Sequence, residues 1–193
     1  GEVRFEGKNL FDLSEKEMQD IRGKKISMVF QDVYLFQDTV RNNIRFGKAG
    51  ATDDEIIVAA QKACCHDFIM QLPQGYDTMI GEGGCTLSGG EKQRISIARA
   101  VLKDAQVILL DEATASLDPE NEVEIQKAIG TLIKGRTVIA IAHRLKTIKK
   151  ADRIIVLDNG QIKEEGTHDE LIRQEGLYSH LWNIQESISG WKL

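Results

Sequence analysis

The chain has 193 residues, of which 41% are hydrophobic and 28% are charged, and its formal net charge is −5. This composition suits one folded domain with a buried core, and it argues against both a disordered chain and a dedicated nucleic-acid binder, which would present a basic face. No apolar run approaches the length that a bilayer requires, and the first residues do not form a signal peptide. Three cysteines without a metal-type spacing favour a reducing, cytosolic compartment.

The first elements are short. Residues 3–5 alternate with polar neighbours and predict a strand that ends at the turn "EGKN". Ser14 and Glu17 have the spacing of a capping box, which predicts a helix from Glu15 to Ile21. Residues 26–30, "ISMVF", predict a buried strand that ends at Gln31.

A predominantly helical block follows, from about residue 33 to residue 99. Thr52 and Glu55 form a second capping-box pattern, ahead of "IIVAAQKACC". Pro73 and Gly75 mark a turn, and the glycine-dense residues 81–84 mark a loop. A helix is predicted from Glu91 to Leu102, because it carries an apolar side.

Strands and helices alternate in the remainder, which indicates an α/β layered core into which the helical block is inserted. The run 107–110 is continuously apolar, as expected for a strand covered on both faces. Asn159-Gly160 is a strong hairpin signal. The other predicted elements are buried strands at 137–142 and 154–157, and helices at 121–133, 168–174 and 177–184.

Two carboxylates, Asp111 and Glu112, follow the apolar run and would lie at the carboxyl end of a central strand. Ligands bind at that edge of open α/β sheets. Phosphoryl transfer needs one carboxylate near Mg²⁺ and another group that orients or deprotonates the attacking water. Asp111 suits the first role and Glu112 the second, although a strand that ends in a polar loop is also common.

The stretch "LSGGE", residues 87–91, predicts an anion site. Its two glycines free the backbone to approach a ligand, Ser88 offers a hydroxyl, and a helix begins at once, so that N–H groups and the positive helix end face a phosphate. An ordinary turn that caps a helix is the alternative. The order of Gln31, "LSGGEKQR", "VILLDE" and His143 along the chain argues against that alternative.

In this order the motifs resemble those of the nucleotide-binding domain of an ATP-binding cassette (ABC) transporter, over essentially the whole chain. Gln31 in "VFQD" matches the Q-loop, and Asp111 ends a segment that matches Walker B. "ASLD", residues 115–118, matches the D-loop, and His143 in "IAHR" matches the switch histidine. The segments 35–47 and 81–84 resemble those that face the membrane domains in exporters, although Gly83 stands where exporters often carry arginine.

The resemblance implies a set of roles. It implies that Glu112, His143 and Gln31 are catalytic, and that Asp111 and Gln31 bind Mg²⁺. The signature residues would contact the ATP of a partner copy, and Ser116 and Asp118 belong to the D-loop. The signature residues are Leu87, Ser88, Gly89, Gly90 and Glu91. The other histidines and the cysteines are interpreted as packing or surface residues.

The implied fold is a P-loop NTPase (RecA-like) core with an inserted helical signature subdomain. Its parts would be residues 1–33, with the Q-loop at the end, the helical subdomain 34–98, and the rest of the core, 99–193. The chain contains no G-x-x-x-x-G-K-[ST] loop, so the resemblance covers a domain that lacks its N-terminal part. Without that loop, the isolated chain is expected to bind ATP weakly and to hydrolyse it negligibly.

The implied partners are a second nucleotide-binding domain, identical or different, and the coupling helices of transmembrane domains, at the cytoplasmic face of a membrane. Nucleic acid is not expected as a partner. Three alternatives stay open: the ATPase of an importer, a soluble cassette protein that works on DNA or ribosomes, and a non-catalytic interaction domain. The DNA-repair type is disfavoured because only a short block without sustained heptads separates Gln31 from the signature.

Overall fold

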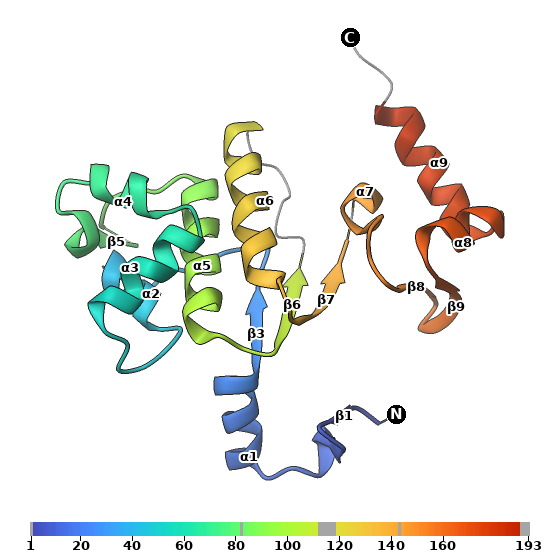
Figure 1. Ribbon diagram of the computed structural model, residues 1–193, viewed down its shortest axis with the longest axis horizontal. Coiled ribbons are helices and arrows are strands. Elements are labelled where there is room, and N and C mark those ends of the chain that lie inside the picture. The colour runs from blue at the N-terminus through green and yellow to red at the C-terminus, as the bar shows by residue number, and fades with distance from the viewer. Residues whose placement is uncertain (1, 82, 112–118, 143, 190–193) are drawn as a thin grey trace. The chain divides into compact units, whose positions relative to one another are not determined.

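The computed structural model describes residues 2–81, 83–111, 119–142 and 144–189 (Figure 1). The chain divides into two compact units, Gly1–Ile139 and Ala140–Leu193. The predicted boundaries after residues 33 and 98 stay predictions.

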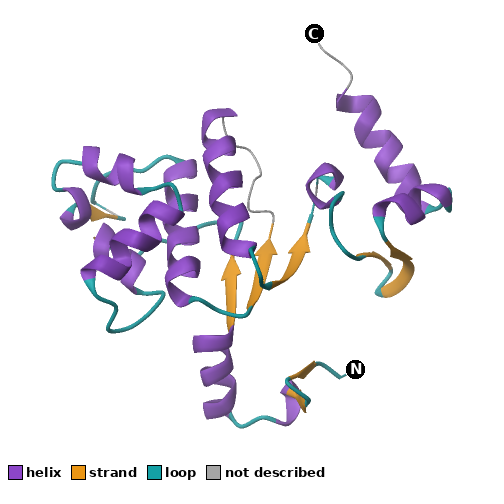
Figure 2. Ribbon diagram, in the orientation of Figure 1, coloured by secondary structure: helices purple, strands orange, loops and turns teal. Residues whose placement is uncertain are grey.

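The described elements mix helices and strands throughout the chain (Figure 2). The strands are β1 (Arg4–Phe5), β2 (Lys8–Asn9), β3 (Ile26–Val29), β4 (Asp38–Thr39), β5 (Met79–Ile80), β6 (Val107–Asp111), β7 (Thr137–Ile141), β8 (Ile154–Asp158) and β9 (Gln161–Gly166). The α-helices are α1 (Glu15–Asp20), α2 (Val40–Arg45), α3 (Asp53–Lys62), α4 (His66–Gln71), α5 (Gly89–Lys103), α6 (Pro119–Ile133), α7 (Leu145–Ile148), α8 (His168–Arg173) and α9 (Leu177–Ser189). Short turns of other helix types are η1 (Leu10–Asp12), η2 (Ile21–Lys25) and η3 (Gly75–Asp77).

The N-terminal elements follow from local sequence signals. β1 and β2 pair antiparallel across a turn in which Glu6 and Gly7 have φ angles of 49° and 79°. Both sides of the predicted capping box form at α1, since Ser14 accepts from the Glu17 amide and the Glu17 carboxylate accepts from the Ser14 amide. The prediction of α1 is confirmed, and a π-helical turn, η2, connects α1 to β3.

A three-stranded sheet, in the order β3-β6-β7, supports the predicted site. β3 and β6 are parallel, and their register runs from Ile26 opposite Val107 to Val29 opposite Leu110. The carboxyl ends of these two strands therefore lie side by side: β3 ends at Val29 and β6 ends at Asp111.

A helical block packs beside this sheet in the first unit (Figure 1). α5 packs against α2, α3 and α6, and it also contacts β3. The core residues that these elements bury completely include Val29, Val40, Ile44, Ile56, Ile95, Ile97, Ile108, Ile125 and Leu132. The second capping box, formed by Thr52 and Glu55 at α3, is confirmed.

In the second unit a hairpin and two helices enclose a small core around Ile154, Leu171 and Tyr178. Asn159 and Gly160 both have positive φ, 49° and 74°, and they join β8 to β9 as the sequence predicts. α9 begins where the carboxylate of Glu164 accepts the amides of Leu177 and Tyr178.

The predicted burial of β7 and β8 is wrong for this chain. Ile139 and Ile141 in β7, and Ile155 and Leu157 in β8, are each more than half exposed. Among the described strands, β7 follows β6 at one end of the sheet order, and β8 pairs with β9 in a two-stranded sheet. An apolar run is buried on both sides only where a second layer covers each face.

None of the helices in the described part of the chain has both the length and the apolar character needed to cross a membrane.

Candidate functional site

The predicted signature motif is a capped turn at the start of α5. Ser88 is the N-cap: its hydroxyl accepts from the Glu91 amide at 3.3 Å, and the Glu91 carboxylate accepts from the Ser88 amide at 2.7 Å. Leu87 is buried and anchors the turn, whereas Ser88 and Gly89 are exposed. The positive end of a 15-residue helix therefore meets solvent at Ser88 and Gly89, which suits an anion.

Gly90 brings the signature turn against the start of α6. A Cβ at Gly90 would lie 2.4 Å from Cγ of Asn121, so only glycine allows this approach without a shift. Arg94, one turn further along α5, donates to Asn121 Oδ1 at 3.0 Å. The turn is therefore fixed to the helix that follows residues 112–118 in the sequence.

Gln31 and Asp111 stand at the carboxyl ends of two adjacent parallel strands. Asp111 is the last residue of β6, and Gln31 lies two residues past the end of the adjacent parallel strand β3. Asp111 is half-buried and Gln31 is exposed. Two oxygen-bearing side chains therefore stand where open α/β sheets bind their ligands.

Glu112, Ser116, Asp118 and His143 lie outside the described residues. Their flanks are described: β6 ends just before Glu112, and α6 begins just after Asp118. The roles given to these four residues stay predictions.

A buried asparagine, which the sequence analysis did not identify, organises the segment after Gln31. Asn43 in α2 is fully buried, and its side chain accepts from the Phe36 amide at 2.9 Å. Its amide group donates to the carbonyls of Phe36, Asp38 and Thr39 at 3.0–3.3 Å. The available signal was a polar residue next to Ile44, inside the predicted helical block.

The same segment carries exposed aromatic rings beside a cavity. Tyr34 is 73% exposed and meets Phe36 edge to face at 5.3 Å, and Phe36 lies 4.7 Å from Phe46. A cavity of about 350 Å³ in the first unit is lined in part by Tyr34. Its lining includes Tyr34, Leu35, Ile80, Cys85, Leu87 and Lys92. Residues after Gln31, the 81–84 loop region and the signature thus share one concave surface.

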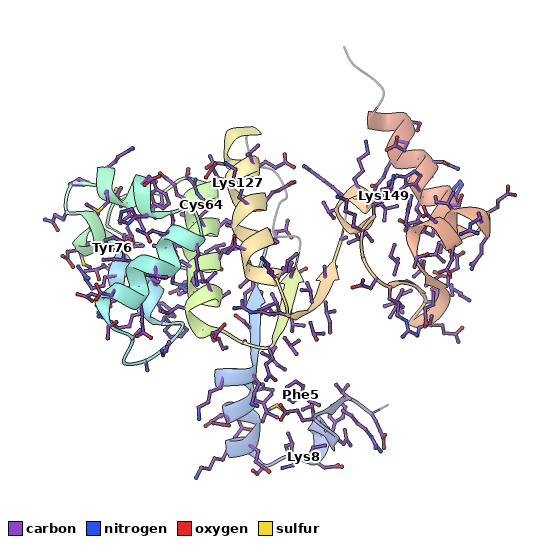
Figure 3. The ribbon with its side chains drawn as sticks, in the orientation of Figure 1. Phe5, Lys8, Cys64, Tyr76, Lys127 and Lys149 are labelled. Carbon is purple, nitrogen blue, oxygen red and sulfur yellow. The ribbon has the colours of Figure 1, made fainter. Side chains whose placement is uncertain are left out.

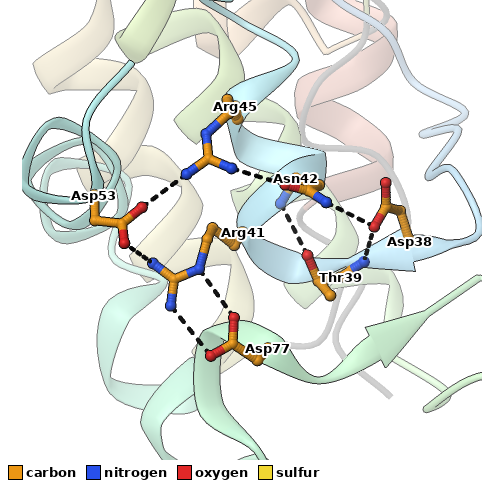
Figure 4. A network of polar contacts seen from close by, with 7 residues as sticks. All are labelled: Asp38, Thr39, Arg41, Asn42, Arg45, Asp53 and Asp77. Carbon is orange, nitrogen blue, oxygen red and sulfur yellow. Dashed lines mark hydrogen bonds and ion pairs between the residues drawn. The ribbon is translucent and has the colours of Figure 1, made fainter. Parts of the chain in front are cut away.

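An ion-pair network fixes α2 against its neighbours (Figure 4). Arg41 contacts Asp77 in η3 through two hydrogen bonds of 2.9 and 3.2 Å, and it contacts Asp53 at the start of α3 at 2.8 Å. Arg45 contacts the other oxygen of Asp53 at 2.7 Å. The hydrogen bond from Arg41 lowers the pKa of Asp77. The carboxylate of Asp77 is therefore charged at neutral pH, and the network braces the segment that carries the aromatic rings.

The cysteines differ in environment, and two of them lie next to each other where α3 ends. Burial, followed by the charge of Glu124, raises the pKa of Cys64, which lies just past the end of α3 and near Lys127 of α6 (Figure 3). Burial raises the pKa of Cys65 to about 12, and Cys65 is fully buried.

We expect Cys65 to resist alkylation at pH 8. A raised pKa leaves almost no thiolate, and the thiolate is the reactive species. Iodoacetamide labelling followed by peptide mass spectrometry checks this, with partly exposed Cys85 as the internal control. Labelling of Cys65 as fast as Cys85 in the folded protein would contradict the prediction, and unfolding in urea should make the two rates equal.

Comparisons with known proteins agree with this geometry. The family described as "ABC transporter" matches residues 1–115. The chain is 52% identical over 185 residues to an ATP-dependent lipid A-core flippase of Syntrophus aciditrophicus, a match that covers 96% of this chain and 30% of the flippase. It is 50% identical to a Staphylococcus aureus protein named as a multidrug export ATP-binding/permease protein, over 96% of this chain and 31% of that protein.

A solved structure of a bacterial Atm1-family ABC exporter with ATP bound superposes with a TM-score of 0.85 at 42% identity, over 96% of this chain and 32% of the exporter chain. The chain thus spans about a third of the length of these relatives. The match over more than half of its residues, the P-loop NTPase fold of its structural neighbour and the position of its motifs lead to one assignment. The chain belongs to the ABC transporter family and is part of a nucleotide-binding domain.

Proposed function

We propose that this chain is part of the ATPase of an exporter and that its signature turn binds the ATP held by a partner domain. The observation that carries the proposal is the exposed, capped turn at Ser88 and Gly89, at the positive end of α5. Backbone amides at such a helix end bind phosphate without further side chains. The exporter assignment draws on the relatives, which are named as a flippase and as export proteins.

Gln31 and Asp111 fit a Mg²⁺ ion that accompanies the nucleotide. Their oxygens are the hard donors that Mg²⁺ prefers, and they lie at the ends of adjacent strands. Within the described residues, no group of three or more His, Cys, Asp or Glu side chains gathers as a metal site. Mg²⁺ usually takes most of its ligands from substrate phosphates and water, so two protein side chains are enough for this proposal. When bound, Mg²⁺ would neutralise charge that develops on the phosphates.

Hydrolysis in this proposal depends on Glu112, which directly follows Asp111 in the sequence, and on His143. Glu112 accepts a proton from the attacking water, and His143 holds the water and the γ-phosphate in line. Ser88, Gly89 and Gly90 stabilise the γ-phosphate from the partner side, as fixed dipoles that need no reorganisation during the reaction. Leu87 and Glu91 shape that turn. Ser116 and Asp118 keep the D-loop role that the sequence motif implies.

The partners of this domain are, in our proposal, a second nucleotide-binding domain and the coupling helices of transmembrane domains. The exposed rings of Tyr34, Phe36 and Phe46, with the cavity beside them, suit an apolar helical segment. The domain then works at the cytoplasmic face of a membrane.

Replacing Ser88 with Arg in the full-length protein tests the proposal. A bulky side chain in the turn should block the approach of the γ-phosphate and lower kcat for ATP by about 10²-fold, the effect of losing one transition-state donor. Ser14→Arg is the matched control, because Ser14 caps α1 with the same reciprocal geometry. The control loses about 1 kcal/mol of cap energy and should keep its turnover. Equal turnover in both variants would refute the role of the turn.

A further inference from the structure

Two side chains of α5 donate hydrogen bonds to the backbone on either side of Gln31. Gln93, which is only 4% exposed, donates from Nε2 to the carbonyl of Phe30 at 3.2 Å. Arg99 donates from Nη1 to the carbonyl of Tyr34 at 2.7 Å. The segment that contains Gln31 is thereby attached at both ends to the helix that begins at the signature turn.

The side chain of Arg99 also contacts Asn43 of α2 and two aromatic rings. It donates to the Asn43 carbonyl at 2.7 Å and to Asn43 Oδ1 at 2.5 Å, and its guanidinium lies 5.4 Å from the Phe36 ring and 5.9 Å from the Phe46 ring. Burial lowers the pKa of Arg99 to about 10, so the side chain keeps its charge at neutral pH. Its hydrogen bonds are charge-assisted, and such bonds are the stronger kind.

Both acceptors next to Gln31 are main-chain carbonyls, so the contacts fix the path of the backbone whatever side chains the segment carries. α5 is a continuous helix of 15 residues, and its first turn is the signature motif. A displacement of the segment by a docked partner would therefore move the helix and its N-terminal turn together. Hydrogen bonds to a rigid element are the kind of contiguous network that carries such coupling.

We propose that Gln93 and Arg99 are positioning residues that join the Gln31 segment to α5. The surface formed by the rings of Tyr34, Phe36 and Phe46, proposed above to receive a coupling helix, then moves together with the turn at Ser88 and Gly89. The proposal deepens the proposed function and rests on it for its role in transport. Its physical core, the attachment of the segment, is independent of ATP hydrolysis.

Cleavage by chymotrypsin tests this attachment directly. The two carbonyls that accept these hydrogen bonds belong to Phe30 and Tyr34, and chymotrypsin cuts after such aromatic residues. In the full-length protein, Gln93→Met should speed native-state cleavage after Phe30, and Arg99→Met cleavage after Tyr34. The rate after Phe30 should rise about tenfold, the effect of one lost hydrogen bond on local opening. The rate after Tyr34 should rise at least as much, because Arg99→Met removes three hydrogen bonds. Arg99→Lys keeps the charge and part of the donor set, and it should give an intermediate rate.

Lys103→Met is the matched control. Lys103 also lies on α5 and donates to a carbonyl, that of Arg22 at 2.6 Å, away from the Gln31 segment. This variant should leave both cleavage rates unchanged. Cleavage at Phe30 and Tyr34 that matches wild type in Gln93→Met and Arg99→Met overturns the proposal. If Arg99→Met fails to fold, Gln93→Met and Arg99→Lys decide it.

A double-mutant cycle on kcat for MgATP then tests the functional consequence. If Arg99 acts through the segment, Arg99→Met alone should lower kcat, and Gln31→Ala with Arg99→Met should be about as slow as Gln31→Ala alone. Lys103→Met should leave kcat unchanged both in the wild-type and in the Gln31→Ala background. Multiplied effects in the Arg99 cycle would show a merely structural role and overturn the proposal. A wild-type protein without ATPase activity would refute the proposed function instead. The cleavage rates would still show whether Gln93 and Arg99 hold the Gln31 segment against α5.

Discussion

Replacing Glu112 with Gln in the full-length protein should lower the rate of ATP hydrolysis by about 10²–10⁴-fold, the usual contribution of a general base, and should leave ATP binding intact. Glu112 directly follows Asp111, the last residue of β6, at the edge of the sheet where Gln31 also lies. The amide keeps the size of the side chain but cannot accept the proton of the attacking water. Binding should survive because it depends on phosphate contacts made elsewhere.

The measurement is kcat for MgATP together with the affinity for ATP by calorimetry. Glu15→Gln is the control for loss of one carboxylate, since Glu15 is exposed in the first turn of α1. It should change neither quantity by more than about twofold, because a surface charge near a helix end contributes only tenths of a kcal/mol. Turnover of the Glu112 variant at the control's rate would remove Glu112 from the catalytic role. Loss of ATP binding would instead make it a binding residue.

Local signals predicted the elements that depend on a few neighbouring residues. The capping boxes at Ser14 and Thr52 were readable because both partners are three residues apart, and both form. The turn at Asn159 and Gly160 was readable because few residues other than asparagine and glycine adopt positive φ in succession. The start of α5 was placed two residues late, since Gly89 and Gly90 usually weaken a helix.

The parts of the site that depend on strand ends could be predicted from the sequence. The parts that depend on contacts between residues far apart in the sequence could not. Gln31 and Asp111 were each predicted at the carboxyl end of an apolar strand, and the parallel pairing of β3 with β6 brings those two strand ends side by side. The contacts of Arg99 with Tyr34 and Asn43 join residues 65 and 56 positions apart, and no local periodicity records them. The burial of β7 was overestimated for a related reason, since burial depends on which layers cover a strand.

A Gly47→Ala substitution should lower the free energy of unfolding by about 3 kcal/mol, at the upper end of overpacking effects. A Cβ at this position would lie 2.2 Å from the carbonyl oxygen of Arg99 and 3.0 Å from its carbonyl carbon. Those atoms are backbone of α5, which cannot move aside without breaking its packing against α2 and α3. Urea unfolding followed by circular dichroism measures the change.

Gly130→Ala supplies the opposite sign from the same chemical change. Gly130 lies inside α6 on an exposed position, and a Cβ there meets nothing within 4 Å. Alanine should therefore stabilise the protein by about 1 kcal/mol through helix propensity alone. Equal effects of the two substitutions would contradict the close approach at Gly47. A loss at Gly47 together with a gain at Gly130 would show that the backbone of α5 packs closely against Gly47 in solution.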